Sequence, residues 1–484
     1  MADELTYEEL KLGERARDAF LSGKSVEYIG KHCPVYLNTN TSNGIGSLHA
    51  TDYIIAGVLA GMRVLIGGQY GSGKSQAAYD IFNYYFGGSK LKNGEGVRID
   101  VNPDTNIMAP VNSIYTCYTG EEKAGIVTPK VELSKNVEAL FHWVDEINRT
   151  PTPKQNQFYA PLNGQVSHEG REAHIGREGY SAVIATANLG NGLYQGTFDF
   201  DPALKNRFGV VIDTNYALFE PTSEDRGLVA LLREADPGLK AAPIRNISQQ
   251  ILKANKTIQQ NSLHPYLEEQ AVLWYLQEGL KTCLKKKDST RVKEGEFWFN
   301  ECRECPYNPE TSRALCSFSG APVQRTLEAT RKYAAALSYL NTLKSPDKPL
   351  NSVDLTFKAF ELTAAYQPFI NPDVTQNYKG HFGKLMKEFC ALLKEDFRTK
   401  EDALCNSLET AQRGNTRYFV RNKVSPSEIM PLELSPEQEK MKKELEEKYD
   451  FINLFTEDRT IDLRWVDSRA ELLRKISKTR RLAP

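Results

Sequence analysis

Short apolar runs without polar alternation recur through residues 60–215. Such continuous runs are typical of parallel strands that are covered on both faces. Segments with helical character lie before and between them, for example residues 49–62 and 153–163. Strands that alternate with helices predict an α/β fold, a parallel sheet with helices on both faces. The predicted strands are residues 64–66, 96–102, 139–144, 180–191 and 210–212.

The second half of the chain has mainly helical patterns. Residues 319–340 show strong helical periodicity after Pro322. Further on, an amphipathic stripe predicts a helix whose apolar side is formed by Phe382, Leu385, Met386 and Phe389. Near the N-terminus, Thr6 followed by Glu9 matches a helix capping box. The alternative is that Glu8 and Glu9 are only solvated charges. The segment 165–179 is polar and predicts a hairpin or insert.

A glycine-rich break follows the first predicted strand. Gly68, Gly73, Lys74 and Ser75 fit the phosphate-binding pattern G-x-x-x-x-G-K-S. Glycines let backbone N–H groups turn toward an anion, and the next helix points its N-terminus at the same anion. Lys74 can then reach the β- and γ-phosphates of ATP, while the Ser75 hydroxyl can hold Mg²⁺. The expected ATP-binding loop comprises Gly68, Gly71, Ser72, Gly73, Lys74 and Ser75.

Two carboxylates end the predicted strand 139–144. Open α/β sheets place their sites at the carboxyl ends of strands, which is where Asp145 and Glu146 are expected. Asp145 can bind the nucleotide's Mg²⁺ through water, and Glu146 can orient and polarise the attacking water. The alternative is that both acids only cap the strand.

The order of five motifs resembles the MoxR-type branch of AAA+ ATPases, a branch with an insert in helix 2. The motifs are GGQYGSGKS, HWVDEINRTP, VIATANLGN, PALKNRF and GAPVQRTLE, within residues 45–375. The resemblance implies hexameric rings in which an arginine enters the neighbour's site. It further implies a Walker A motif at Gly68 to Ser75, a Walker B motif at Asp145 and Glu146, Asn188 as sensor 1, Arg207 as arginine finger and Arg325 as sensor 2.

These implied roles have simpler alternatives. Asn188 could be a turn residue at a strand end, and Arg207 or Arg325 could form ordinary surface salt bridges. Arg149 could also reach across a subunit boundary. No aromatic-hydrophobic-glycine pore loop is evident, so pulling or twisting a folded partner is favoured over threading an unfolded chain.

Four cysteines have a spacing that suits a metal. Cys283, Cys302, Cys305 and Cys316 follow the pattern C-x18-C-x2-C-x10-C in a Lys-rich stretch. Two thiolates two residues apart can bind one ion, and two more complete a zinc site or hold an iron–sulfur cluster. Four unrelated thiols are the alternative. The cysteines expected in the core are Cys33, Cys117, Cys390 and Cys405.

The net charge and the composition limit the kinds of partner that the protein is expected to bind. The chain has 484 residues and a net charge of −1, which gives no global attraction to nucleic acid or anionic membranes. No apolar run of transmembrane length and no secretory signal is evident, so a cytoplasmic protein is expected. The predicted parts are a helical lead-in (1–44), an α/β nucleotide-binding domain (45–222), a helical lid (223–375) with a Cys-rich insertion (about 280–318), and a helical C-terminal extension (376–484).

Three functions follow from these features. The first is a Mg²⁺-dependent ATPase ring that remodels or activates a client protein, as the resemblance implies. The second is a DNA or RNA motor of the minichromosome-maintenance type, since the phrase from Arg325 to Glu328 is similar to that family's sensor 2. The near-zero net charge disfavours this motor. The third is a nucleotide-gated scaffold with weak turnover.

Overall fold

The structure is a computed structural model of the whole chain. The residues that it describes are 5–12, 22–25, 45–68, 72–88, 95–101, 112–123, 126–168, 171–188, 198, 200–214, 244–263, 265–279, 318–320, 322–371, 374, 377–378, 382–402 and 404–405.

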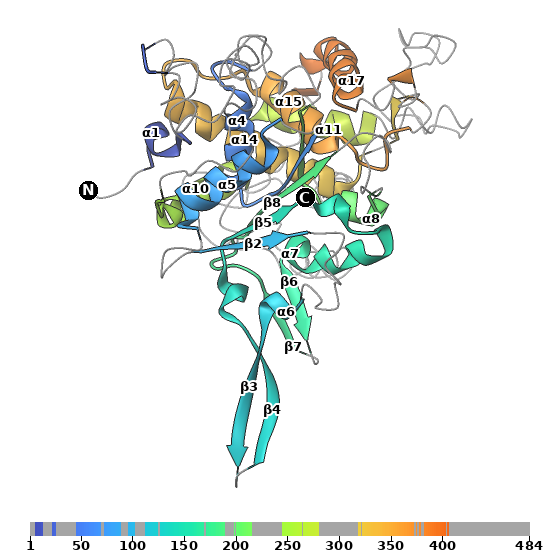
Figure 1. Cartoon of the computed structure of the whole chain (residues 1–484). Helices are drawn as coiled ribbons and strands as arrows, with labels where there is room; N and C mark the ends of the chain where they lie inside the picture. Colours follow the sequence, from blue (N-terminus) through green and yellow to red (C-terminus); the bar gives the residue numbers. More distant parts are fainter. Residues whose placement is uncertain are drawn as a thin grey trace, which may run out of the picture.

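A five-stranded sheet with the order β2-β5-β8-β1-β9 forms the centre of the molecule (Figure 1). All four neighbouring pairs are parallel. The α/β class and all five predicted strands are therefore confirmed. The strands are β1 (Arg63–Gly68), β2 (Gly96–Asp100), β5 (Phe141–Asp145), β8 (Ala182–Asn188) and β9 (Val210–Asp213).

Both faces of the sheet are buried, which explains why the strand sequences do not alternate between apolar and polar residues. Val64 and Ile66 of β1 pack into one apolar core, whereas Leu65 between them packs into the other. Because side chains alternate along a strand, each face needs its own helical layer.

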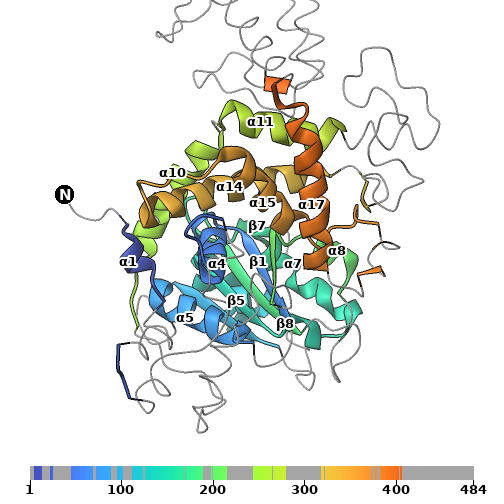
Figure 2. The ribbon, with the colours of Figure 1, turned by 90° about the horizontal axis from the view of Figure 1, so that it is seen from above.

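The helices form these two layers, as Figure 2 shows from above. One core is completed mainly by α4 (Ala50–Leu59), α5 (Lys74–Phe86), α10 (Ser248–Leu263) and α14 (Gln324–Lys344). The other core is completed by α7 (Tyr159–Asn163), α11 (Leu267–Trp274) and α17 (Phe382–Arg398). The helix α15 (Ser352–Ala364) contributes side chains to both cores. The predicted helices of the second half are thus present, and α17 belongs to the main body.

Two antiparallel hairpins lie outside this sheet. The predicted polar hairpin is present as β6 (Gln165–His168) and β7 (Arg171–His174). A longer hairpin of β3 (Thr116–Lys123) and β4 (Ile126–Leu133) follows the short helix α6 (Asn112–Tyr115). It extends far from the sheet (Figure 1), so its sequence need not follow a core-facing pattern, and the sequence did not predict it.

Several smaller predictions have mixed outcomes. The helix α1 (Tyr7–Leu10) has the capping box of Thr6 and Glu9. The predicted helix 153–163 begins as a 3-10 helix, η3 (Thr152–Phe158), before α7. Cys390 is buried as expected, but Cys117 is exposed on the long hairpin, so its assignment to the core was wrong. None of the described helices has the length and hydropathy needed to cross a membrane.

The remaining short elements connect these parts. They are η1 (Lys135–Glu138), η2 (Ile147–Arg149), α8 (Pro202–Lys205) and the π-helical turn η4 (Tyr275–Gly279).

Candidate functional site

The candidate site lies where β1, β5 and β8 end. These strands are parallel, so their carboxyl ends meet at one edge of the sheet. Gly68 at the end of β1 pairs with Asn188 at the end of β8. Asp145 ends β5, which pairs with β8 on its other side. The register therefore brings the glycine loop, the acidic pair and Asn188 together.

Two glycines in the loop have conformations that other residues rarely adopt. Gly68 has φ 144°, and a Cβ there would lie 1.7 Å from Oγ1 of Thr214. Gly73 has φ 77° and is the N-cap of α5, which begins at Lys74. Both positions need glycine for the turn from strand to helix. Residues 69–71, including Gly71, lie outside the described part of the chain.

The side chain of Lys74 is buried, with 7% of the residue exposed, and it contacts residues on both sides of the undescribed segment 69–71. Its Nζ donates to the Gly68 carbonyl at 3.2 Å and to Ser72 Oγ at 3.4 Å. Burial lowers its pKa to about 8, and the nearby charges of Glu146 and Asp145 partly oppose this. A phosphate oxygen is a stronger acceptor for an ammonium than a carbonyl, so the lysine is suited to exchange these partners for an anion.

Asp145 receives two hydroxyl groups. Ser75 Oγ donates to Asp145 Oδ1 at 2.8 Å, and Thr186 Oγ1 donates to the same oxygen at 2.5 Å. A hydroxyl and a carboxylate are hard oxygen ligands, which fit Mg²⁺. The predicted pair Ser75 and Asp145 is thus in contact. Thr186, two residues before Asn188 on the same strand, has no motif signal in the sequence that predicts this contact.

Glu146, the residue after Asp145, has a left-handed backbone conformation with φ 54° and ψ 46°. This conformation is uncommon for residues other than glycine and often occurs at functional sites. Its N–H donates to Thr186 Oγ1 at 2.9 Å. Arg149 Nε lies 2.6 Å from its Oε2, and Asn188 Nδ2 donates to its Oε1 at 3.3 Å. Each carboxylate oxygen keeps further lone pairs with which it can accept a proton from water.

Asn148 connects the acidic turn to β8. Its Nδ2 donates to the Asn188 carbonyl at 2.8 Å, and the Asn188 N–H donates to its Oδ1 at 3.2 Å. Both side chains are almost completely buried. Asn148 was not predicted as a site residue, and its one signal in the sequence is an amide two residues after Glu146 in DEINR.

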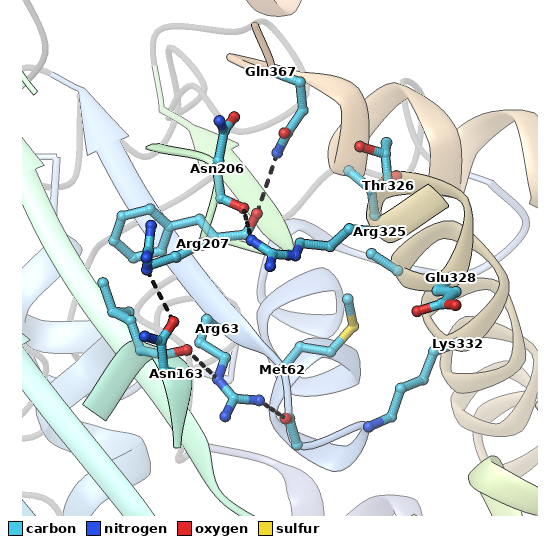
Figure 3. Close-up of a pocket in the computed structure, with 16 residues that line it drawn as sticks. Met62, Arg63, Asn163, Asn206, Arg207, Arg325, Thr326, Glu328, Lys332 and Gln367 are labelled. Atoms are coloured by element: carbon cyan, nitrogen blue, oxygen red, sulfur yellow. Dashed lines mark hydrogen bonds between the residues drawn. The ribbon is translucent and has the colours of Figure 1, made fainter. Parts of the chain in front are cut away.

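Arg207 and Arg325 lie at the opposite edge of the sheet. Arg325 Nη1 donates to the carbonyl of Asn206 at 3.4 Å, and the Arg207 guanidinium lies 3.8 Å from the ring centroid of Tyr159. Both line a pocket of about 320 Å³ with Arg63, where β1 begins (Figure 3).

The two groups of predicted residues are therefore separated by the length of a strand. The six residues of β1 span roughly 16 Å between the pocket and the phosphate loop. The structure brings Lys74, Ser75, Asp145, Glu146 and Asn188 together at one edge, and Arg207 with Arg325 at the other.

The predicted cysteine site lies outside the described residues. Cys283, Cys302, Cys305 and Cys316 all fall within 280–317, so the zinc or iron–sulfur prediction stays a prediction. In the part of the chain that the structure describes, no group of three or more His, Cys, Asp or Glu side chains is arranged to hold a metal ion.

Comparisons with known proteins give distant structural similarities. No protein-family model and no curated protein matches this sequence. Among solved structures, a candidate ATPase from Cytophaga hutchinsonii is similar over 77% of this chain and 94% of its own, with 14% identity and a TM-score of 0.45. A full-length MCM homolog from Methanopyrus kandleri is similar over 65% of this chain and 55% of its own, with 12% identity and a TM-score of 0.37.

Proposed function

We propose that this protein is a Mg²⁺-dependent ATP hydrolase of the AAA+ class. One observation carries the proposal, namely the hydrogen-bonded chain from Ser75 through Asp145 and Thr186 to Glu146. It joins the hydroxyl that follows the phosphate-loop lysine to a carboxylate at the end of β5, which is separated from β1 by β8. A phosphate-binding loop and a base that can reach water beside it are the two parts that hydrolysis of a nucleoside triphosphate needs.

Each residue has a distinct role in this mechanism. Lys74 and the N-terminus of α5 hold the β- and γ-phosphates. Ser75 and Asp145 would hold Mg²⁺, which would offset phosphate charge. Glu146 accepts a proton from the water that attacks the γ-phosphorus, and the bond to the bridging oxygen of ADP breaks. The Asn188 amide orients that water or the γ-phosphate.

We further propose that the site is shared between copies of the chain in a ring, which the motif resemblance implies is a hexamer. Arg207 and Arg325 lie a strand's length from Lys74, so they are poorly placed to contact the nucleotide of their own chain. An arginine at the opposite edge can instead stabilise transition-state charge in a neighbour's site.

The proposed work of the ring is to remodel or activate a client protein in the manner of MoxR-type ATPases. This assignment rests on the motif resemblance and on the long β3–β4 hairpin, which offers an extended element for contact with a partner. A nucleic-acid motor is less well supported, since the net charge is −1. The client is a protein of unknown identity, which a tagged pull-down from native cells can retrieve.

The test of the proposed activity is phosphate release from ATP with Mg²⁺ and with excess EDTA. Wild-type protein should turn over ATP only with Mg²⁺, and Lys74→Ala should lose both ATP binding and turnover. A Lys253→Ala variant, which changes an exposed lysine on α10, is the matched control and should behave as wild type. Turnover that persists in Lys74→Ala would overturn the proposal.

A further inference from the structure

The pocket at the amino ends of the strands contains a lysine that the mechanism above does not use. Arg325, Glu328, Ala329 and Lys332 follow the i, i+3, i+4, i+7 spacing on α14, so they lie on one side of the helix. All four line the pocket. Figure 3 shows the Lys332 side chain extending from α14 toward the segment with Met62 and Arg63.

Lys332 is a cation without an anionic partner. Among the residues that the structure describes, it has neither a hydrogen bond nor an ion pair. Burial and, to a smaller extent, the positive charge of Arg63 lower its pKa to about 8. Removing an ammonium from water is costly unless a counter-charge is close. Lys332 is half-buried and lines a pocket with three arginines, so a ligand that enters this pocket can supply the missing counter-charge.

Three of the other four charged side chains that line the pocket are also cationic. Arg63 is partly buried, and this loss of solvent lowers its pKa. It donates to the backbone carbonyls of Leu162 at 3.0 Å and Gly61 at 3.3 Å. With Arg207, Arg325 and Lys332 it makes four cationic side chains in a pocket that contains one carboxylate, Glu328. The Glu328 carboxylate accepts a hydrogen bond from Gln324 at 3.3 Å.

We propose that this pocket is a second anion site that binds a phosphate group, with Lys332 as a direct ligand. Guanidinium and ammonium groups recognise phosphate through charge-assisted hydrogen bonds. A volume of about 320 Å³ lies at the lower end of the range for small-ligand pockets, which suits phosphate or pyrophosphate. The phosphate can be a free anion or part of a nucleotide held by a second copy.

The inference does not depend on ATP turnover, so its test uses a chain whose phosphate loop is disabled. Pyrophosphate is titrated into Lys74→Ala by calorimetry, and into the same variant with Lys332→Met added. We expect saturable binding in the first and at least a tenfold weaker Kd in the second. Lys332→Arg should retain binding, and Lys253→Met, on the exposed side of α10, should have no effect.

Folding is monitored separately by thermal unfolding. Lys332→Met replaces an unpaired ammonium by an apolar group of similar length, so its Tm should equal or exceed that of the parent. The proposal is overturned if Lys74→Ala shows no saturable binding at roughly 10 mM pyrophosphate. It is also overturned if a folded Lys332→Met variant binds with the parent's Kd.

A second arm identifies the source of the phosphate. Wild-type chains loaded with a slowly hydrolysed ATP analogue are mixed with Lys74→Ala before pyrophosphate is added. If assembly abolishes pyrophosphate binding, the neighbour's nucleotide occupies the pocket. If binding persists unchanged, the natural ligand is a free phosphate-bearing anion.

Discussion

The side-chain amide of Asn148 forms two hydrogen bonds with the backbone of Asn188, one to its carbonyl and one from its N–H. This pair fixes the turn after β5 to the end of β8. The turn also carries Glu146, whose Oε1 accepts a hydrogen bond from Asn188 at 3.3 Å. The relative position of the proposed base and the proposed water-orienting amide therefore depends on Asn148.

Asn148→Asp should lower kcat while leaving the Kd for ATP unchanged. The aspartate keeps the acceptor for the Asn188 N–H, but its second oxygen faces the Asn188 carbonyl and repels it. A displacement of about 1 Å in such a site can lower turnover by about 10²-fold. The measurement is steady-state hydrolysis alongside equilibrium ATP binding.

The control for this variant is Asn156→Asp, an exposed residue in η3 that has no place in the site. It should match wild type in both measurements. A normal kcat in folded Asn148→Asp would show that the two hydrogen bonds between Asn148 and Asn188 do not position the reacting groups.

ATP affinity should depend on pH through Lys74. Its pKa in the free protein is lowered to about 8, and bound phosphate raises it, because the anion favours the charged ammonium. Affinity should therefore be constant below pH 8 and fall by up to about tenfold per pH unit above it. Calorimetry between pH 7 and pH 9.5 measures this directly.

Lys74→Arg separates this effect from other titrations. A guanidinium stays protonated over the whole range, so the variant should bind ATP with an affinity that does not fall above pH 8. If the affinity of the wild-type protein for ATP stays constant up to pH 9.5, ATP binding does not depend on the protonation of Lys74.

Arg207→Ala should leave ATP affinity nearly intact and lower turnover by about 10³-fold, the low end for arginine fingers. Mixing it with Lys74→Ala should restore part of the activity, because one chain supplies a working phosphate loop and the other supplies the arginine. Absence of rescue at every mixing ratio would argue against a site shared between chains.

The strands and the phosphate loop were predictable because their signals are local. A continuous apolar run, a glycine pattern and an acidic pair can each be recognised in the sequence alone. The meeting of Glu146 with Asn188 was also predictable, since parallel strands align their carboxyl ends. The fold class and the residues at the carboxyl edge of the sheet could therefore be predicted from the sequence.

Other features depend on tertiary packing and had no local signal. The amide of Asn148 faces β8 because the preceding Glu146 adopts a left-handed conformation, which no pattern indicated. The pocket forms because α14 docks Arg325 and Lys332 against the start of β1, far away in sequence. The resemblance gave Arg325 a role, but it did not place it beside Arg207.

Glu146→Gln gives the most direct test of the central claim, that this chain hydrolyses ATP with Glu146 as the base. Glutamine keeps the shape of the side chain but cannot accept the proton of the attacking water. Equilibrium binding and phosphate release are measured on the same preparation with Mg²⁺. The account predicts an unchanged Kd for ATP and a kcat lowered by about 10²-fold or more. Turnover at the wild-type rate would contradict it.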